Sequence, residues 1–260
     1  MKTDLQVVLI TGASSGIGEA LAVEYAEPSV HLVLLGRNLD NLQRVAHHCQ
    51  AKGAQVKILQ ADVSEVDDLR KKMFQLDDEL PVELLIANAG VTSGLGAEQW
   101  VEPWDGVKSV AEINFLGVLA AVSPITERMV ARQHGQIAIM GSLSAYRGLP
   151  SCPAYSASKA GVEAYGLALR AGLAAQNVKV NVISPGYVTS AMSRQLTGPK
   201  PFLISAESAA RTIKKGLANN RARISFPFPL NLGARLLALL PDRLARLILP
   251  YFAFTVEIDR

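Results

Sequence analysis

The sequence predicts an α/β fold: a doubly wound parallel sheet of about seven strands in three layers, with extra C-terminal helices. Short apolar runs alternate with longer amphipathic segments, and a glycine-rich turn joins the first run to the first amphipathic segment. Near-continuous apolar strands that alternate with helices indicate a parallel sheet covered on both faces. The chain has 260 residues, 49% of them hydrophobic and 19% charged, which suits one sizeable α/β domain.

The expected elements follow from the spacing of apolar residues. The expected strands are Leu5–Ile10, His31–Leu35, Gln55–Gln60, Val82–Ala87, Gln136–Met140, Val178–Ile183 and a weaker Arg223–Phe226. The expected helices are Gly16–Ala26, Leu39–Ala51, Val66–Leu76, Val107–Arg132, Ala154–Gln176 and Ala206–Ala218. Pro28 closes the first helix, and we expect Ser64 to cap the third. No repeat or long linker divides the chain, so we expect one domain over residues 1–260, with 224–260 as a hydrophobic, basic extension.

Composition excludes several classes of function. The net charge of +3 lies wholly in the tail, where six arginines face three acidic residues from Arg221 onward, and this argues against a nucleic-acid partner. Cys49 and Cys152 are far apart, and the four histidines form no ligand pattern, so we expect neither a disulfide framework nor a metal site. We find no signal peptide and no run of roughly 18 uncharged apolar residues, and we therefore expect a cytoplasmic protein.

The glycine-rich turn Thr11–Gly18 lies directly between the first strand and the first helix. Its three glycines allow a tight turn and close approach of the backbone to a pyrophosphate, and the helix N-terminus offers free N–H groups. A glycine-rich turn without a ligand is the plain alternative, but the strand–turn–helix context that the motif requires is met. We expect cofactor contacts from Gly12, Ser14, Ser15, Gly16, Ile17 and Gly18.

A tyrosine and a lysine begin the helix that is expected after the fifth strand. Tyr155 and Lys159 are four residues apart, so on a helix the phenol and the ammonium share a face. A cation beside the phenol should lower its pKa from about 10 toward neutrality, where the phenol can exchange a proton efficiently. Tyr-x-x-x-Lys alone is a weak signal; Tyr165, in the same segment, has no lysine four residues later.

Together the two motifs resemble those of the one-domain short-chain dehydrogenases/reductases, and the match extends over residues 5 to about 190. The resemblance implies a Rossmann-type fold and hydride transfer between a nicotinamide cofactor and a carbonyl or alcohol carbon of a small, lipophilic substrate. Ser142 would bond the substrate oxygen, with Ser144 as a weaker second candidate, and Asn114 would hold a water in a proton relay. The implied catalytic residues are Asn114, Ser142, Tyr155 and Lys159.

The resemblance also implies further cofactor contacts. Asp62 and Val63 would lie at the adenine, and the segment from Pro185 would cover the nicotinamide, with a variable substrate loop over residues 192–203. The usual Asn-Asn-Ala-Gly of the family begins here with Ala87, a minor departure. The full set beyond the glycine turn is Arg37, Asp62, Val63, Asn88, Ala89, Gly90, Tyr155, Lys159, Pro185, Gly186, Val188 and Thr189.

The end of the second strand predicts the choice of cofactor. Gly36 stands where relatives that prefer NAD carry aspartate, and Arg37 stands where relatives that prefer NADP carry a basic residue. A cation attracts a 2′-phosphate, whereas a carboxylate repels it and bonds the ribose hydroxyls. We therefore expect NADP(H), although Ser15 is basic in some NADP-dependent members.

The tail departs from the commonest ending of the family. Two apolar segments, 230–240 and 242–249, follow the last strand, and Leu244, Leu247 and Ile248 can share a face bordered by Arg243 and Arg246. We expect this segment to cover the substrate pocket or to be buried in a homo-oligomer, a dimer or tetramer; peripheral contact with a membrane is the alternative. An NADPH-binding regulatory protein without turnover is the competing function, and the intact set of four catalytic residues argues against it.

Overall fold

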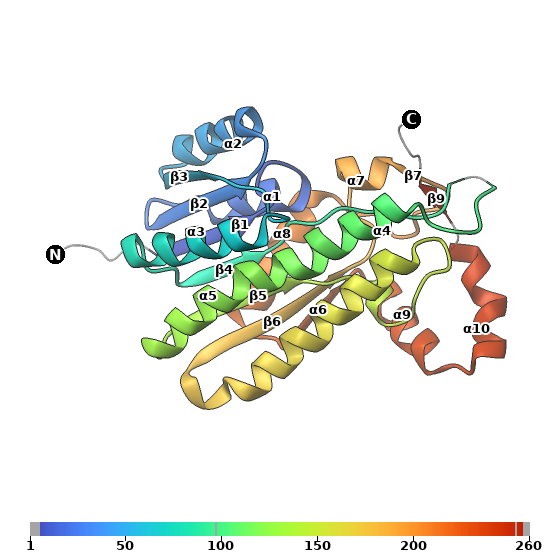
Figure 1. Ribbon diagram of the computed structural model, residues 1–260. Helices are drawn as coiled ribbons and strands as arrows, with labels where there is room; N and C mark the ends of the chain where they lie inside the picture. Colours follow the sequence, from blue (N-terminus) through green and yellow to red (C-terminus); the bar gives the residue numbers. More distant parts are fainter. Residues whose placement is uncertain (1–5, 97, 253, 257–260) are drawn as a thin grey trace.

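The computed structural model describes residues 6–96, 98–252 and 254–256. Seven parallel strands form one sheet in the order β3-β2-β1-β4-β5-β6-β8, which confirms the predicted fold class (Figure 1). The strand order reverses between β1 and β4, the place where open α/β sheets bind ligands beyond the carboxyl ends of their strands. The strands are β1 (Gln6–Thr11), β2 (Val30–Gly36), β3 (Gln55–Gln60), β4 (Leu84–Ala87), β5 (Gly135–Met140), β6 (Val178–Pro185) and β8 (Arg223–Phe226). Leu5, expected in the first strand, lies outside the described residues.

Helices cover both faces of the sheet and bury its alternating side chains. On one face α1 (Gly16–Tyr25), α2 (Leu39–Ala51) and α8 (Ala206–Ala218) pack over one set of strand residues. On the other face α3 (Val66–Glu79), α5 (Gly117–Ala131) and α6 (Pro153–Gly172) cover the alternate set. Neighbouring residues of β1 divide between the two cores, because successive side chains of a strand point to opposite faces.

The helix expected over Val107–Arg132 is a rod that extends from α4 (Trp104–Ala111) to the end of α5. A π-helical turn, Glu112–Leu116, connects its two α-helical parts. Single π turns occur frequently at functional sites, and this one contains Asn114. By length and hydropathy alone the rod could cross a membrane, yet 56% of its most apolar stretch of 18 residues is buried inside the protein. The rod is therefore accounted for as a core helix of the three-layer fold.

The prediction that Ser64 caps the third helix is wrong. Glu65 occupies the N-cap position, and the helix begins at Val66. The backbone N–H and the hydroxyl of Ser64 instead donate to Oδ1 of Asp62, at 3.0 and 2.8 Å. Aspartate competes for nearby backbone donors in this way, and the turn that results holds the Asp62 carboxylate in place.

The tail folds back onto the body of the molecule at the end that carries the carboxyl ends of the strands (Figure 1). It consists of α9 (Leu230–Leu239), α10 (Asp242–Ile248), a 3-10 turn (Leu249–Phe252) and β9 (Thr255–Val256). Strand β9 pairs antiparallel with β7 (Leu196–Thr197), which lies in the expected substrate loop, just after α7 (Ala191–Arg194). The end of the tail therefore supports the loop that we expected to contact substrate.

Candidate active site

The glycine turn after β1 is so tightly packed that Gly12 and Gly18 have no room for a side chain. Gly12 has φ +66°, and a Cβ there would lie 2.8 Å from Cα of Ala89. A Cβ on Gly18 would lie 2.1 Å from the carbonyl oxygen of Gly12, so the first turn of α1 packs directly against the loop. These two glycines leave a cradle of bare backbone, as the approach of a pyrophosphate requires.

Asn88, which follows β4, holds this turn in place. Its Nδ2 donates to the carbonyl oxygens of Thr11 (3.0 Å) and Gly12 (3.2 Å). In return the Thr11 hydroxyl accepts from the backbone N–H groups of Asn88 and Ala89, both at 3.0 Å. These bonds tie the segment after β4 to the turn after β1.

The N-terminus of α1 is open toward the turn. Ser15 occupies the N-cap position with extended backbone, and its side chain caps no N–H among the described residues. The first N–H groups of a helix lack partners within the helix and carry the positive end of its dipole, so they attract phosphate. The turn and the helix end together fit the pyrophosphate of a dinucleotide.

One cavity of roughly 1000 Å³ extends from this turn to the tail, and it collects nearly all of the expected cofactor contacts. Two of them, Gly18 and Thr189, are not among its lining residues: Gly18 lies beneath the turn, and the Thr189 hydroxyl donates to the Ile204 carbonyl oxygen at 3.3 Å. The expected residues that line the cavity are Gly12, Ser14, Ser15, Gly16, Ile17, Arg37, Asp62, Val63, Asn88, Ala89, Gly90, Tyr155, Lys159, Pro185, Gly186 and Val188.

Arg37 and Asp62 meet at the end of the cavity formed by β2 and β3. Nη1 of Arg37 lies 3.5 Å from Oδ2 of Asp62, and the arginine side chain remains 63% exposed. Burial alone would raise the pKa of Asp62, but hydrogen bonds from Ser64 and the charge of Arg37 hold it below its ordinary value. The pair therefore presents a loosely held guanidinium and an ionised carboxylate to an incoming ligand.

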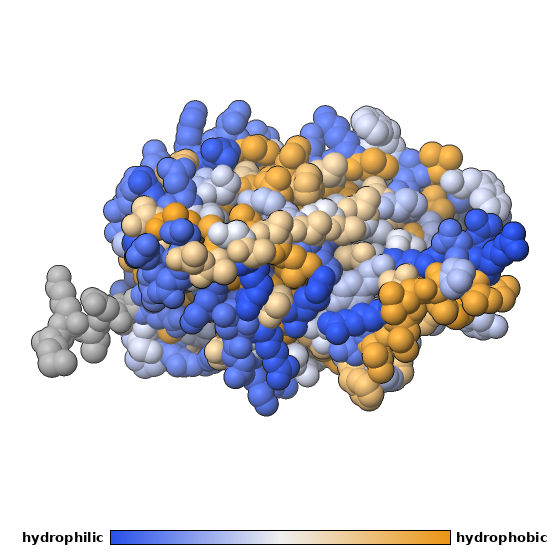
Figure 2. Space-filling model, turned by 90° about the horizontal axis from the view of Figure 1, so that it is seen from below, coloured by the Kyte–Doolittle hydropathy of each residue, from blue (hydrophilic) through white to orange (hydrophobic). Residues whose placement is uncertain are grey.

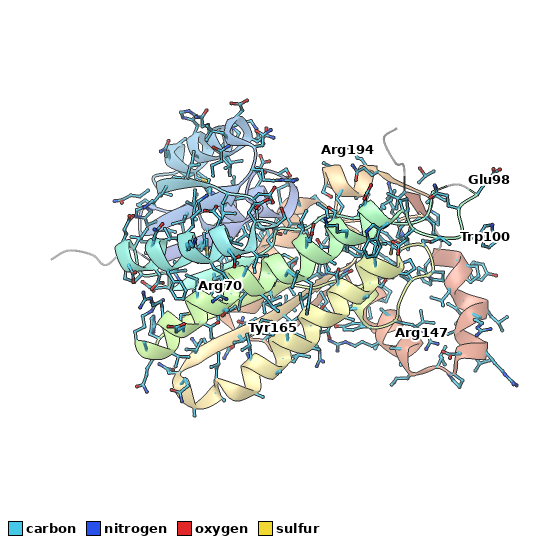
Figure 3. All side chains as sticks on the ribbon, viewed as in Figure 1. Arg70, Glu98, Trp100, Arg147, Tyr165 and Arg194 are labelled. Atoms are coloured by element: carbon cyan, nitrogen blue, oxygen red, sulfur yellow. The ribbon has the colours of Figure 1, made fainter. Side chains whose placement is uncertain are left out.

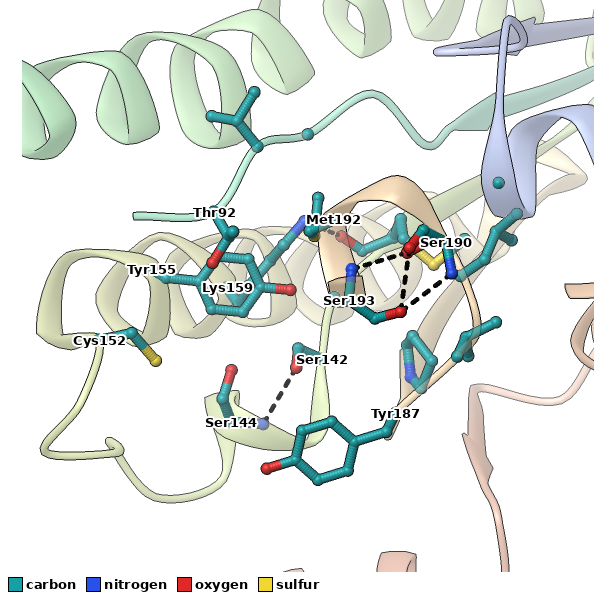
Figure 4. Close-up of a pocket in the computed structure, with 18 of the residues that line it drawn as sticks. Thr92, Ser142, Ser144, Cys152, Tyr155, Lys159, Tyr187, Ser190, Met192 and Ser193 are labelled. Atoms are coloured by element: carbon teal, nitrogen blue, oxygen red, sulfur yellow. Dashed lines mark hydrogen bonds between the residues drawn. The ribbon is translucent and has the colours of Figure 1, made fainter. Parts of the chain in front are cut away.

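The catalytic candidates Ser142, Tyr155 and Lys159 converge on the middle of the same cavity (Figure 4). Ser142 follows β5, and its Oγ accepts from the backbone N–H of Ser144 at 3.2 Å, which leaves its own proton free to donate. Tyr155 and Lys159 point inward from the first turns of α6, and the ammonium lies 5.7 Å from the centre of the phenol ring. The Ser142 hydroxyl lies close enough to the Tyr155 phenol to lower its pKa, against the effect of burial.

The pKa of Tyr155 is raised in this structure, whereas the sequence predicted that it would be lowered. Burial raises it to about 12 and outweighs the opposing influence of the Ser142 hydroxyl. Nζ of Lys159 instead donates to the carbonyl oxygen of Met140 at 2.9 Å, over the face of the phenol ring. The phenol is therefore held protonated at neutral pH, the form that donates a proton.

Lys159 is buried, and burial lowers its pKa to about 8. A lowered pKa is expected for an ammonium that loses water and gains only a neutral carbonyl as its partner. Gly90 provides the space beside it, because a Cβ at that position would lie 3.5 Å from Nζ and 3.1 Å from Oδ1 of Asn114.

Asn114 is fully buried in the π turn, next to the cavity rather than among its lining residues. Its side chain pairs with the backbone of Val91: Oδ1 accepts from the N–H at 2.8 Å, and Nδ2 donates to the carbonyl oxygen at 2.9 Å. The described contacts thus tie the segment after β4 to the long helix. The relay role expected for Asn114 stays a prediction.

Several lining residues had no motif of their own in the sequence. Thr92, Cys152 and Tyr187 reach the cavity around the catalytic hydroxyls (Figure 4). Oγ of Ser144 is buried there without a hydrogen-bond partner in the described structure, so the weaker second candidate offers a free polar group beside Ser142. A signal was present for Tyr187, which lies inside the segment that was expected to cover the nicotinamide.

The outer wall of the cavity is apolar and comes from the tail. The wall comes from α9 and the residue after it, from the last residue of α10 and from the segment that follows α10: Leu230, Gly233, Ala234, Leu236, Leu237, Leu240, Ile248, Phe252 and Phe254. Arg147, on the turn after Ser142, fastens α9: it donates to the carbonyl oxygens of Leu237 (3.3 Å) and Leu240 (2.9 Å) and pairs with Asp242 (Figure 3). The expectation that the tail covers the substrate pocket agrees with this wall.

Fold and site define a class: oxidoreductases that bind a nicotinamide dinucleotide at the carboxyl ends of a parallel sheet. The short chain dehydrogenase family matches residues 6–200, and the chain belongs to the short-chain dehydrogenase/reductase family. It is thus an NAD(P)-dependent oxidoreductase. No group of three potential metal ligands occurs among the residues that the structure describes.

Individual proteins agree with this assignment. The chain is 35% identical, over 92% of its length and 94% of the relative, to an uncharacterized oxidoreductase of Myxococcus xanthus. It is 33% identical to 11-beta-hydroxysteroid dehydrogenase A of Sesamum indicum, over 85% of this chain and 68% of that one. A short-chain dehydrogenase from Sphingobium yanoikuyae, solved in complex with NADPH, has the same fold with a TM-score of 0.78 at 24% identity, over 92% and 97% of the two chains.

Proposed function

We propose that this protein uses NADP(H) to interconvert a ketone or aldehyde and the corresponding alcohol in a lipophilic substrate. One observation carries the proposal: a single cavity is lined by the exposed Arg37, by the neighbouring hydroxyls of Ser142 and Tyr155, and by an apolar wall. Arg37 would bond the 2′-phosphate of the cofactor, and the hydroxyls of Ser142 and Tyr155 would bond the reacting oxygen. The apolar wall suits a substrate with little polar surface.

The chain supplies the acid–base part of the reaction. When bound, the nicotinamide supplies the hydride for reduction and accepts it for oxidation. In reduction, charge builds on the substrate oxygen, and the hydroxyls of Ser142 and Tyr155 stabilise it by donating hydrogen bonds. Tyr155 then gives its proton to that oxygen, a step for which its burial keeps it protonated. The buried ammonium of Lys159 lies over the phenol ring and favours the phenolate that forms.

The choice of NADP(H) rests on the end of β2. Gly36 brings no carboxylate of its own to the ribose, and the guanidinium of Arg37 is exposed and can bond a phosphate. A lipophilic substrate is supported by the apolar wall of α9 and by the relative that is named for its action on a hydroxysteroid. These arguments favour a lipophilic substrate whose reacting carbon lies in the cavity that the leucines of the tail cover.

The test is NADPH oxidation measured with a panel of ketones and aldehydes of increasing size and hydrophobicity. Tyr155→Phe should lower turnover roughly 10²–10⁴-fold because the donated proton is lost, while NADPH affinity stays close to wild type. Lys159→Ala should damage both turnover and cofactor binding. Tyr165→Phe is the matched control, since this tyrosine lies on the same helix outside the lining of the cavity.

Near-normal rates for Tyr155→Phe would contradict the mechanism. Tight NADPH binding without turnover of any compound in the panel would favour the regulatory alternative.

A further inference from the structure

We propose that α9 and α10 form a docking surface for a bilayer that contains anionic phospholipid, and that lipophilic substrate enters the cavity through this surface. The second part rests on the proposed function; the first part stands without it. We call the surface the tail surface. It is defined by six side chains that are 48–81% exposed: Phe228, Leu232, Leu239, Leu244, Leu247 and Tyr251.

The tail surface is far more apolar than a solvated helix pair requires. Hydrophobic residues gather over the end of the molecule that carries α9 and α10 (Figure 2). Every residue of α9 is described, and none of them is fully buried, although nine of its ten residues are leucine, alanine, glycine or asparagine and only Arg235 is charged. Contiguous exposed apolar patches of this kind mark contact with a partner or a membrane.

The charge of the tail surface selects the partner. Residues 227–256 contain a single acidic residue, Asp242, and its carboxylate is already paired with Arg147. Arg243 and Arg246 are exposed, and neither has a carboxylate partner among residues 6–96, 98–252 and 254–256. The surface therefore offers leucines flanked by unpaired cations, a combination that suits apolar lipid chains beneath negative headgroups.

A second copy of the chain fits this surface less well. A two-fold dimer brings the same patch of both subunits together, so Arg243 and Arg246 would face their own counterparts. Among residues 227–256 no carboxylate is left free to pair with them, and like charges across an interface oppose binding. Anionic lipid supplies the missing negative charge.

The tail surface is continuous with the cavity. Leu236 and Ile248 line the cavity and are also among the exposed hydrophobic residues, so they form a shared rim. A substrate dissolved in the bilayer could pass this rim without crossing water. The surface thus combines attachment with delivery.

The first experiment measures binding to vesicles, independently of catalysis. Full-length protein is floated with vesicles of phosphatidylcholine mixed with phosphatidylglycerol, and with vesicles of phosphatidylcholine alone. We expect the protein to bind the mixed vesicles and salt to weaken this binding. Arg243→Ala and Arg246→Ala should each lower the affinity for the mixed vesicles roughly fivefold. Lys71→Ala with Arg211→Ala removes the same charge from α3 and α8 and should leave binding unchanged.

The second variant tests the apolar part. Leu239→Glu with Leu247→Glu should abolish flotation, whereas Leu239→Met with Leu247→Met should retain it. Both leucines are highly exposed and do not line the cavity, so turnover of a water-soluble ketone should equal that of wild type. Turnover of a ketone delivered in the mixed vesicles should fall severalfold in the glutamate variant alone.

Light scattering separates the outcomes. The proposal would be overturned if the variant with Leu239→Glu and Leu247→Glu still bound the mixed vesicles, or if the wild-type protein did not bind them. A wild-type dimer that the glutamate pair converts to monomers would assign the surface to a second copy. If the protein binds the vesicles as expected but reduces no ketone, the proposed function is contradicted and the proposed docking surface is still supported.

Discussion

Removal of the Arg37 side chain should weaken use of NADPH and spare NADH. A hydrogen bond to a charged group contributes about 1.5–3 kcal/mol. Because Arg37 is 63% exposed, water and salt screen its charge, and we expect about 1–2 kcal/mol. Arg37→Ala should therefore lower kcat/KM for NADPH roughly five- to thirtyfold, with little change for NADH.

A second substitution should reverse the preference. A Cβ on Gly36 would have only ordinary contacts, 3.5 Å from Cδ2 of Leu42 and from Oγ of Ser14, so the first side-chain atom of an aspartate is accommodated there. Its carboxylate would repel a 2′-phosphate and could bond the ribose hydroxyls of NADH. Gly36→Asp with Arg37→Ala should thus favour NADH.

The assay is initial-rate kinetics with both cofactors and one ketone, at low and at physiological ionic strength. Arg44→Ala is the control, because this exposed arginine of the neighbouring helix pairs with Glu19 outside the cavity lining. Wild-type protein that uses both cofactors with equal efficiency would refute the reasoning, and so would a selectivity that Arg37→Ala leaves unchanged.

Three further outcomes follow from the described contacts. The rate of ketone reduction should be level near neutrality and fall as pH rises through about 8, because Lys159 is charged only below its lowered pKa, while Tyr155 stays protonated; a rate that rises there would contradict this. Gly12→Ala should remove the thermal stabilisation by NADPH, since its φ of +66° and the backbone after β4 exclude a Cβ; an unchanged shift would show that the cradle is not needed. Arg132→Ala should cost about 3 kcal/mol in urea unfolding, because the buried carboxylate of Asp77 loses its cationic partner and keeps only the bond from the Val82 N–H; a loss below about 1 kcal/mol would argue against that pairing.

The regular part of the fold was accessible to sequence reasoning because burial imposes a pattern. Strands β1, β2 and β4 are apolar along nearly their whole length, since both faces of the sheet are covered. The long helix was also expected, but not its π turn, because one extra residue in a turn leaves the apolar period almost unchanged. Strands β7 and β9 have two residues each, too few for any period to be visible.

Site residues were accessible where a motif fixes them locally, and inaccessible where distant segments meet. The spacing of Tyr155 and Lys159 places both on one face of a helix whatever surrounds them. The pKa of Tyr155 depends instead on how completely the folded chain buries the phenol, and for that reason its direction was predicted wrongly. Ser64 illustrates the same limit. Its hydroxyl could cap the helix or bond to Asp62, and in the structure it donates to the carboxylate of Asp62.

The tail shows why its functions cannot be separated by truncation. Removal of everything after Asn220 would delete the edge strand β8, the wall made by α9, and β9, which holds the substrate loop. Phe254 and Val256 also pack in one cluster with Cys152, against which Tyr155 rests. A truncated protein would therefore lose its site together with any membrane contact. Point substitutions at exposed positions such as Leu239 avoid this, because the inner face of the tail builds the pocket and the outer face is free to meet a partner.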